Sequence, residues 1–464
     1  MVSTTQQRGW HSEVRAIWWL ALPLILTNFA HVAVTTIDII VLGSLGAREL
    51  AAGGLAIALF NQLRTMGTGL VTSVSNLVAE AQARDDQARI RQLLVAGMFW
   101  ATVSGLAFIV LLLALEQPLI WVGQEPDIAA LTFEYLLLAA PGLLPCLWFQ
   151  TLRHFTVGLK YPGPLLAITL ISIGLTAFLN YSLVFGKFGM PALGFIGVAL
   201  TTSVVFLLSF LMFLIVVIKN KRLAPYFSLP ELRWSSAAVR DVWKLGLPIA
   251  GTYASEAGFF TVLTLLIGLL GVEALAAQTV LNQIIYIVFM ISAGISHAAS
   301  IHISEACGIA DYARAKKLGY IAIGLGVASM LIVAVPYLLV PNTLVSWFIS
   351  ADQRTNAATF SLAVSGLLIA AVLQIFDASQ NIGNGILRGT GDTAGPFRIS
   401  LLGYWLVGLP CAYLLGFLTG FGIYGVWMGQ AIGLAATAVL LGVSFHQRIT
   451  DLRRQETSPA ASGQ

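Results

Sequence analysis

Long apolar stretches alternate with short polar segments along almost the whole chain. An apolar stretch of about 20 residues is long enough to cross the roughly 30 Å hydrocarbon core of a bilayer as a helix. The pattern therefore predicts twelve transmembrane helices. The expected spans are residues 16–42, 50–77, 93–115, 129–151, 164–186, 194–218, 245–270, 276–303, 318–341, 357–387, 397–419 and 424–446.

The composition agrees with lipid as the main solvent. Of the 464 residues, 58% are hydrophobic and only 10% are charged, whereas soluble domains carry roughly 25% charged residues. The mean hydropathy is +0.85. We therefore expect an all-α polytopic membrane protein, embedded in the lipid bilayer.

Lysine and arginine are distributed unevenly between the two sides of the predicted topology. With a cytoplasmic N-terminus, 21 of them fall in cytoplasmic segments, and three (Arg48, Lys187 and Arg354) fall on the opposite side, with Arg64 left inside the second span. The positive-inside rule then places both termini in the cytoplasm, as for a multi-pass protein of the inner (plasma) membrane. The net charge of +4 follows from this topology, and we expect no nucleic-acid partner.

The two halves of the sequence repeat. At a shift of 225 residues, Pro23 pairs with Pro248 and Asp86 pairs with Asp311, and shifts of 231 and 228 continue the repeat in later helices. Six helices per half is an even number, so both halves start on the same side of the membrane. We expect two six-helix lobes related by a pseudo-two-fold axis along the membrane normal, as in parallel-repeat transporters.

The expected domain boundaries follow from this repeat. Residues 1–218 form the N-terminal lobe, and residues 245–446 form the C-terminal lobe. The polar, basic stretch 219–244 is the expected cytoplasmic linker, and residues 447–464 are expected to form a disordered cytoplasmic tail. Because each lobe has its counterpart in the same chain, we expect a monomer.

Three carboxylates lie inside predicted spans: Asp38, Glu256 and Asp377. A charge at that depth costs roughly 2.5 to 3.5 kcal/mol on insertion scales, which makes such an acid a candidate functional group. None of the three recurs in the other half, so packing alone does not explain them. The residues opposite them in the repeat are Leu263, His31 and Cys146, respectively.

Several stretches resemble the NorM branch of the multidrug and toxin extrusion (MATE) transporters. These are the run QIFDASQNIGNGILRGTGDT at 374–393, the segment TTIDIIVLG at 35–43, Glu256, and the run NYSLVFGKFGMPALGFIG at 180–197. The resemblance covers nearly the whole chain. It implies a secondary active exporter of organic cation drugs and dyes, working by antiport against Na⁺ or H⁺ with alternating access, and no resident cofactor.

The same resemblance implies a cation or proton site in the N-terminal lobe, made of Asp38, Asn180 and Thr202. Relatives often carry a second asparagine where this chain has Thr176, which we take as an auxiliary residue. His31 is a second auxiliary candidate, because it lies two helical turns before Asp38 on roughly the same face.

In the C-terminal lobe the resemblance assigns coupling roles to Glu256 and Asp377. Some relatives place a tyrosine where this chain has Leu373. If Na⁺ is the coupling ion, Asp38, Glu256 and Asp377 are its expected ligands. Aromatic residues that could offer cation-π surfaces in a substrate cavity are Tyr253, Phe259, Phe260, Tyr286 and Phe289.

Other functions fit the sequence less well. A membrane enzyme is disfavoured because the chain has no HExxH motif, no phosphate loop and no metal-spaced His/Cys cluster. A lipid-linked saccharide flippase of the same superfamily would need a cationic cavity, whereas the intramembrane charge here is mainly acidic. Alternatively, Asp38, Asn180 and Thr202 form an inert hydrogen-bonded cluster, and Glu256 and Asp377 merely line a wet cavity.

Overall fold

The computed structural model describes residues 9–121, 124–227, 233–348 and 357–457, and these residues are almost entirely helical. Contacts divide the chain into two compact units. We call Leu26–Ala254 the N-terminal unit, and Met1–Ile25 together with Ser255–Gln464 the C-terminal unit. The division falls inside α1 (Trp10–Leu45) and inside α9 (Ser236–Gly268), shortly after the proline that each helix contains.

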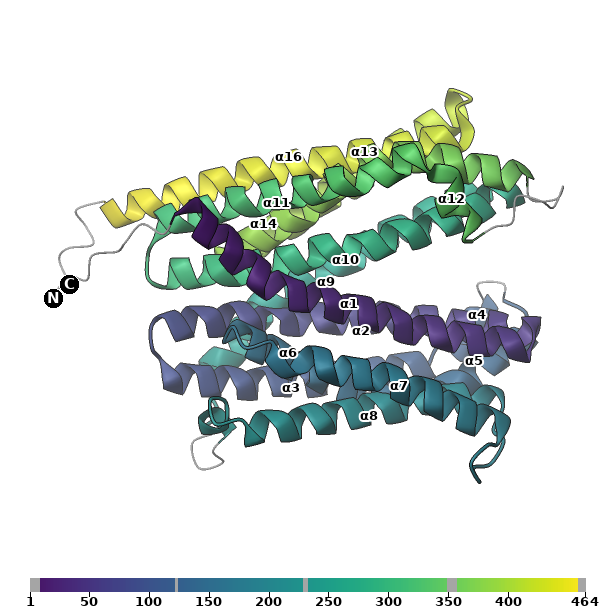
Figure 1. Ribbon diagram of the computed structural model, residues 1–464, viewed down its shortest axis with the longest axis horizontal. Coiled ribbons are helices and arrows are strands. Elements are labelled where there is room, and N and C mark those ends of the chain that lie inside the picture. The colour runs from purple at the N-terminus through teal and green to yellow at the C-terminus, as the bar shows by residue number, and fades with distance from the viewer. Residues whose placement is uncertain (1–8, 122–123, 228–232, 349–356, 458–464) are drawn as a thin grey trace. The chain divides into compact units, whose positions relative to one another are not determined.

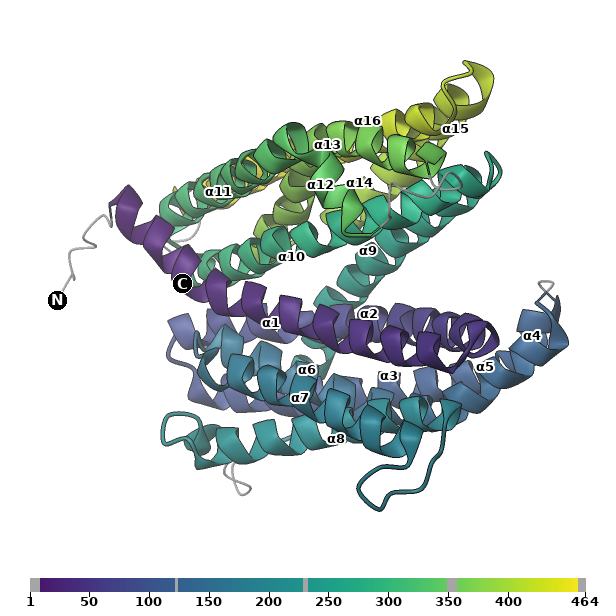
Figure 2. The ribbon, with the colours of Figure 1, turned by 45° about the vertical axis from the view of Figure 1, so that its right-hand side comes forward.

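The N-terminal unit is a helical bundle that includes the later part of α1 and the first part of α9. In it α2 packs against α3, α5 and α6, and α7 packs against α8 (Figure 1). Figure 2 shows α4 and the connection between α7 and α8 at one end of this unit, and the turn between α2 and α3 at the other. Its remaining helices are α2 (Ala47–Ala83), α3 (Gln87–Leu113), α4 (Glu116–Trp121), α5 (Pro126–Ala139), α6 (Leu143–Gly158), α7 (Gly163–Phe185) and α8 (Phe195–Lys219).

The C-terminal unit is built around α13, which packs against α10, α11 and α16 (Figure 1). The described start of α1 and the described end of α16 lie at the same end of this unit. The helices that follow α9 are α10 (Val272–Gly308), α11 (Tyr312–Leu339), α12 (Pro341–Ser346), α13 (Ala357–Gly389), α14 (Ala394–Leu401), α15 (Leu409–Tyr413) and α16 (Gly422–Thr457). Two π-helical segments, η4 (Leu402–Gly408) and η5 (Leu414–Leu418), join α14, α15 and the turn before α16.

The sequence repeat is also a structural repeat. α2 and α10 follow Gly46 and Gly271, whose φ angles of 152° and 121° suit glycine. Asp86 and Asp311 cap α3 and α11, and each carboxylate accepts the backbone N–H three residues later at 2.9 Å. The same local chemistry therefore starts the second and third helices of both halves.

The predicted spans correspond to helices. Eleven helical segments among the described residues are long and apolar enough to cross a membrane. The span predicted at residues 50–77 lies on α2, which is long enough but does not reach the same apolar composition. The span predicted at 129–151 contains a 3₁₀ turn at Ala140–Gly142, because Pro141 interrupts the α-helical hydrogen bonding.

Two predicted boundaries differ from the helices observed. The expected linker reaches residue 244, but α9 already begins at Ser236. The tail expected to be disordered from residue 447 is helical as far as Thr457, because α16 continues beyond its apolar part. Residues 458–464 and Arg354 lie outside the described residues, and the lobe boundaries at 218 and 245 stay a prediction.

Candidate functional sites

Asp38 in α1 is buried in the N-terminal unit, with 6% of its surface exposed. The amide nitrogen of Asn180, on α7, donates a hydrogen bond of 2.7 Å to its Oδ1 atom. Asn180 is fully buried, and its own Oδ1 has no hydrogen-bond partner in the described part of the chain. The pair therefore presents a carboxylate together with an unused amide oxygen.

A pocket with a cavity volume of about 40 Å³ lies beside Asp38. Thr176 on α7 and Thr202 on α8 line it with Asp38, as the sequence hypothesis required for a shared site. Both hydroxyls donate within their own helices, Thr176 to Ser172 at 2.8 Å and Thr202 to Val198 at 3.2 Å. Their oxygen lone pairs remain available to a cation. Further residues of the wall are Phe60, Asn61, Tyr135 and Phe206.

His31, the second auxiliary candidate, lies outside this pocket wall. Its ring meets Phe149 edge-on, with centroids 6.4 Å apart. Its Nε2 atom is buried and has no hydrogen-bond partner among the described residues. His31 therefore packs against an aromatic ring in this structure, and nothing places it at the Asp38 carboxylate.

Glu256 and Asp377 come together in the C-terminal unit, although they are far apart in the sequence. Glu256 lies on α9 and is partly buried, whereas Asp377 on α13 is buried. The amide nitrogen of Gln380 donates to Glu256 Oε1 at 3.1 Å and to Asp377 Oδ1 at 3.2 Å. One side-chain amide therefore links the two acids.

Further hydrogen bonds fix how Gln380 is oriented. The hydroxyl of Tyr404 donates to Gln380 Oε1 at 2.7 Å, and the amide nitrogen of Asn384 donates to the same oxygen at 3.1 Å. With its oxygen occupied by two donors, Gln380 must turn its NH₂ group toward the acids. Tyr404 reaches this position from the π-helical segment η4, and such segments often occur at functional sites.

Both sites hold carboxylates that are shielded from water. A buried carboxylate is stabilised by a proton or a cation that compensates its charge. In the C-terminal unit two carboxylates share one neutral donor, so together they offer more negative charge than the amide can offset. No group of three or more His, Cys, Asp or Glu side chains lies together in the described ranges. A Na⁺ ligand set would therefore have to draw on amide and hydroxyl oxygens as well as these acids.

The aromatic residues expected in a substrate cavity have different surroundings. Phe259 is fully buried in the core and stacks on Tyr404, with centroids 5.1 Å apart and planes 11° apart. The Phe259 side chain therefore lies in the packed core of this structure, and its role in a substrate cavity stays a prediction. Tyr286 is 47% exposed, and Phe260 and Phe289 are partly buried in the same unit. Tyr253 belongs to the N-terminal unit.

Several polar residues of these sites were missed by sequence reasoning. Gln380 and Asn384 lie within the motif that carried the family resemblance, and their spacing from Asp377 places them on its side of the helix. Tyr404 and Tyr135 carry no comparable sequence signal. Arg153, which the topology placed in a cytoplasmic segment, is buried in α6 and donates to Asn28 Oδ1 at 2.9 Å.

The fold is shared with solved MATE transporters. A eukaryotic MATE transporter matches with a TM-score of 0.83 at 21% identity, over 97% of this chain and all of the other. A MATE protein crystallised in complex with MaL6 matches with a TM-score of 0.88 at 18% identity, over 95% of this chain and 97% of the other. These likenesses concern the fold alone.

Sequence comparison identifies the family. The MatE family model matches residues 23–182 and 248–414, one segment in each half. The chain is 37% identical to a probable multidrug resistance protein NorM of Pseudomonas aeruginosa, over 97% of this chain and 92% of the relative. It is 34% identical to the multidrug resistance protein NorM of Burkholderia vietnamiensis, over 93% of this chain and 94% of the relative. The chain therefore belongs to the MatE family of multidrug and toxin extrusion transporters, in its NorM branch.

Proposed function

We propose that this protein is a secondary active multidrug exporter, which exchanges amphipathic organic cations for Na⁺ or H⁺. Acids that accept hydrogen bonds from amides lie in membrane-crossing helices of both units, with Asp38 and Asp377 buried and Glu256 partly buried, and this arrangement supports the proposal. Family membership supports the same function. The intramembrane acids favour cationic over anionic cargo, which disfavours the flippase alternative.

In the N-terminal unit, the coupling ion and the organic cation compete for Asp38. Asn180 donates a hydrogen bond to the carboxylate, and Asp38 lines a pocket together with Thr176 and Thr202. Entry of the coupling ion compensates the buried charge and removes the attraction for the drug. Release of the ion leaves the Asp38 carboxylate charged and able to bind the next drug molecule. Each ligand shifts the balance between inward-open and outward-open states, because it binds one state more tightly than the other.

In the C-terminal unit, Glu256 and Asp377 act as a coupled pair. Gln380 holds both acids through one NH₂ group, so a change of charge on one acid is felt by the other. Binding of a proton or Na⁺ between them relieves their mutual repulsion. We assign this pair to ion coupling, and assign no catalytic residue in either unit.

The proposed transport implies a membrane location, an orientation and a set of partners. The protein works in the inner membrane as a monomer with both termini in the cytoplasm, and its partners are organic cation drugs and dyes, Na⁺ or H⁺, and lipid. The unequal distribution of lysine and arginine between the two predicted sides supports this orientation.

Neutralisation of the acids tests the proposal. The variants Asp38→Asn, Glu256→Gln and Asp377→Asn should insert and fold, because each keeps the shape of the side chain, and each should lower drug efflux to the background of cells without the protein. Asp451→Asn, at an exposed acid near the end of α16, is the matched control and should keep full efflux. Correctly inserted acid variants that still confer full resistance would contradict the assigned roles.

A further inference from the structure

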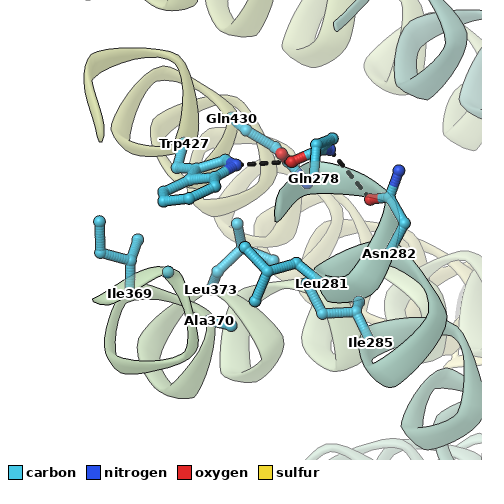
Figure 3. A pocket seen from close by; sticks show the side chains of 10 residues that line it. Gln278, Leu281, Asn282, Ile285, Ile369, Ala370, Leu373, Trp427 and Gln430 are labelled. Carbon is cyan, nitrogen blue, oxygen red and sulfur yellow. Dashed lines mark hydrogen bonds between the residues drawn. The ribbon is translucent and has the colours of Figure 1, made fainter. Parts of the chain in front are cut away.

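The pocket between α10, α13 and α16 of the C-terminal unit has no room for an organic ligand (Figure 3). Its cavity volume is about 10 Å³, enough for about one water molecule. In its wall the indole N–H of Trp427 donates to Gln278 Oε1 at 2.6 Å, and the Gln278 amide nitrogen donates to Asn282 Oδ1 at 3.0 Å. The exposed starts of α1 and α9, by contrast, carry polar groups without such partners.

One short motif starts the first helix of both halves. At the shift of 225 residues, RAIWWLALP at 15–23 matches RDVWKLGLP at 240–248. The first, fourth, fifth and eighth positions of the motif share one face of a helix. The exposed residues on this face are Arg15, Trp19 and Leu22 on α1, and Arg240, Trp243, Lys244 and Leu247 on α9. Because these side chains are exposed, packing inside the protein does not explain why the motif recurs.

The arginine that starts each motif has no counter-charge in the described part of the chain. Neither Arg15 nor Arg240 makes an ion pair or a side-chain hydrogen bond with a described residue. The acids beside them are already bound. Glu13 accepts from Arg314 of α11 at 2.8 Å, and Asp241 accepts from the arginine at the matching position of α3. Both halves therefore neutralise the acid at this helix start and leave one exposed arginine over.

The motif follows the order of the layers in one leaflet of a bilayer. α1 and α9 are both long and apolar enough to cross a membrane. From the arginine to the last leucine of each motif is seven residues, or about 10 Å along the helix axis. The cation comes first, then the tryptophan, which favours the membrane interface, and then the leucine. This order matches the phosphate, the ester region and the acyl chains of a phospholipid.

The tryptophans of the motif keep their hydrogen-bond donors available. Trp243 stacks on Trp100 of α3, with ring centroids 4.3 Å apart and planes 24° apart. Trp100 is held in turn, because its Nε1 atom donates to the backbone oxygen of Val239 at 2.8 Å. The indole N–H groups of Trp243 and Trp19 make no hydrogen bond to a described residue. Each can therefore donate to an oxygen of a phosphate or an ester, on the same helix face as the arginine.

We propose that residues 15–22 and 240–247 are matched binding sites for anionic phospholipids, one in each unit. The guanidinium binds the headgroup phosphate, the indole N–H donates to a phosphate or ester oxygen, and an acyl chain lies along the leucine. Lys244 adds a second cation to the α9 site, where α1 has Trp19. The predicted topology places the starts of both helices at the cytoplasmic leaflet. Both sites are separate from the acids of the proposed antiport.

The test is native mass spectrometry of the full-length protein in detergent micelles, with phosphatidylglycerol as the probe. Two molecules should bind in preference to phosphatidylcholine with the same acyl chains. Arg15→Gln and Arg240→Gln should each weaken one of the two binding steps about fivefold, the usual contribution of one cation near an anionic lipid surface. Both side chains are exposed and make no internal contact that folding requires, so these variants should fold.

The matched control is Arg448→Gln, at an exposed arginine of α16 that also has no partner among the described residues. It removes the same charge outside the motif and should leave both binding steps unchanged. An equal loss in this variant would show that binding follows net charge alone, and would overturn the proposal. Full affinity in Arg15→Gln and Arg240→Gln, or equal affinity for phosphatidylcholine, would also overturn it.

Two further measurements separate a lipid site from a free-anion site and from the proposed function. Inorganic phosphate should not displace phosphatidylglycerol, because it has no acyl chain to lie along the leucine. Displacement by phosphate would assign these residues to a soluble anion instead and contradict the proposal. Asp38→Asn should keep both lipids, even though it is expected to abolish cation efflux, so either proposal can fail without the other.

Discussion

Gln380 donates the same amide nitrogen to two acids, Glu256 and Asp377, while Tyr404 and Asn384 hold its oxygen. In the substitution Gln380→Leu, both acids lose their shared donor and their coupling. We expect drug efflux to fall at least about tenfold, since a hydrogen bond to a charged group contributes roughly 1.5 to 3 kcal/mol. Initial efflux rates in proteoliposomes, normalised to the inserted protein, measure the effect.

Gln374→Leu is the matched control, because Gln374 is also a buried glutamine of α13. Its amide nitrogen donates to the hydroxyl of Tyr337 at 3.0 Å, and no hydrogen bond joins it to either acid in the described part of the chain. This variant should lose comparable stability but keep its efflux rate. Equal losses of efflux in the two variants would show that Gln380 acts through helix packing rather than through the acids.

Arg314 forms an ion pair that should matter for stability. Its Nε atom donates to Glu13 Oε1 at 2.8 Å, and the Glu13 side chain is only 1% exposed. In Arg314→Ala this carboxylate loses its partner while buried, which should lower the free energy of unfolding by roughly 3 kcal/mol. The Asp311 cap is unaffected, because it binds the backbone N–H of residue 314.

Arg48→Ala provides the comparison, because the Arg48–Asp127 pair is 55% and 79% exposed. Water screens such a pair, so the expected loss is below about 1 kcal/mol. Denaturant unfolding in detergent micelles measures both variants. A loss at Arg314 no larger than that at Arg48 would mean that Glu13 finds another partner or becomes hydrated.

The sequence alone allowed a functional role to be predicted for the three intramembrane acids, because a charged side chain in an apolar span is energetically costly. The partnership of Asp38 with Asn180 came from the family resemblance, since no sequence spacing connects α1 with α7. The meeting of Glu256 and Asp377 through Gln380 could not be derived from composition, because it depends on how α9 and α13 pack.

At the scale of elements, the two halves begin their third helices with the same aspartate cap. Asp311→Ala should lower the free energy of unfolding by about 1 kcal/mol, the usual effect of losing an N-cap acceptor. Asp451→Ala removes an exposed aspartate from α16 and should change it by less than about 0.5 kcal/mol. Unfolding curves measure the free energy of unfolding of both variants. Equal values would mean that water replaces the Asp311 carboxylate as acceptor for the helix N-terminus.

Helix positions could be predicted because apolar runs of membrane length are long and regular. Irregular helical segments could not be predicted in this way. The π-helical segments η4 and η5 occur where the sequence predicted one continuous span. Tight contacts favour this irregular path: a Cβ atom on Gly433 of α16 would lie 2.5 Å from the Cα atom of Gly408. Such backbone approaches depend on tertiary packing, which hydropathy does not encode.

At the scale of the whole molecule, duplication supplied two copies of one framework, which then acquired different chemistry. The N-terminal unit carries Asp38 in its pocket, whereas the C-terminal unit carries the pair Glu256 and Asp377, joined by Gln380. Helices and caps recur in both halves, but these acids do not. This difference explains why the repeat predicted the architecture better than the sites.

Coupling of drug export to an ion gradient by these acids is tested most directly by a transport measurement. Efflux of a fluorescent organic cation from proteoliposomes should be measured with a Na⁺ gradient at constant pH, and then with a pH gradient in the absence of Na⁺. If the acids couple export to an ion, at least one gradient drives efflux, and Asp38→Asn and Asp377→Asn each abolish it. Absence of efflux under both gradients, or undiminished efflux in both variants, would contradict it.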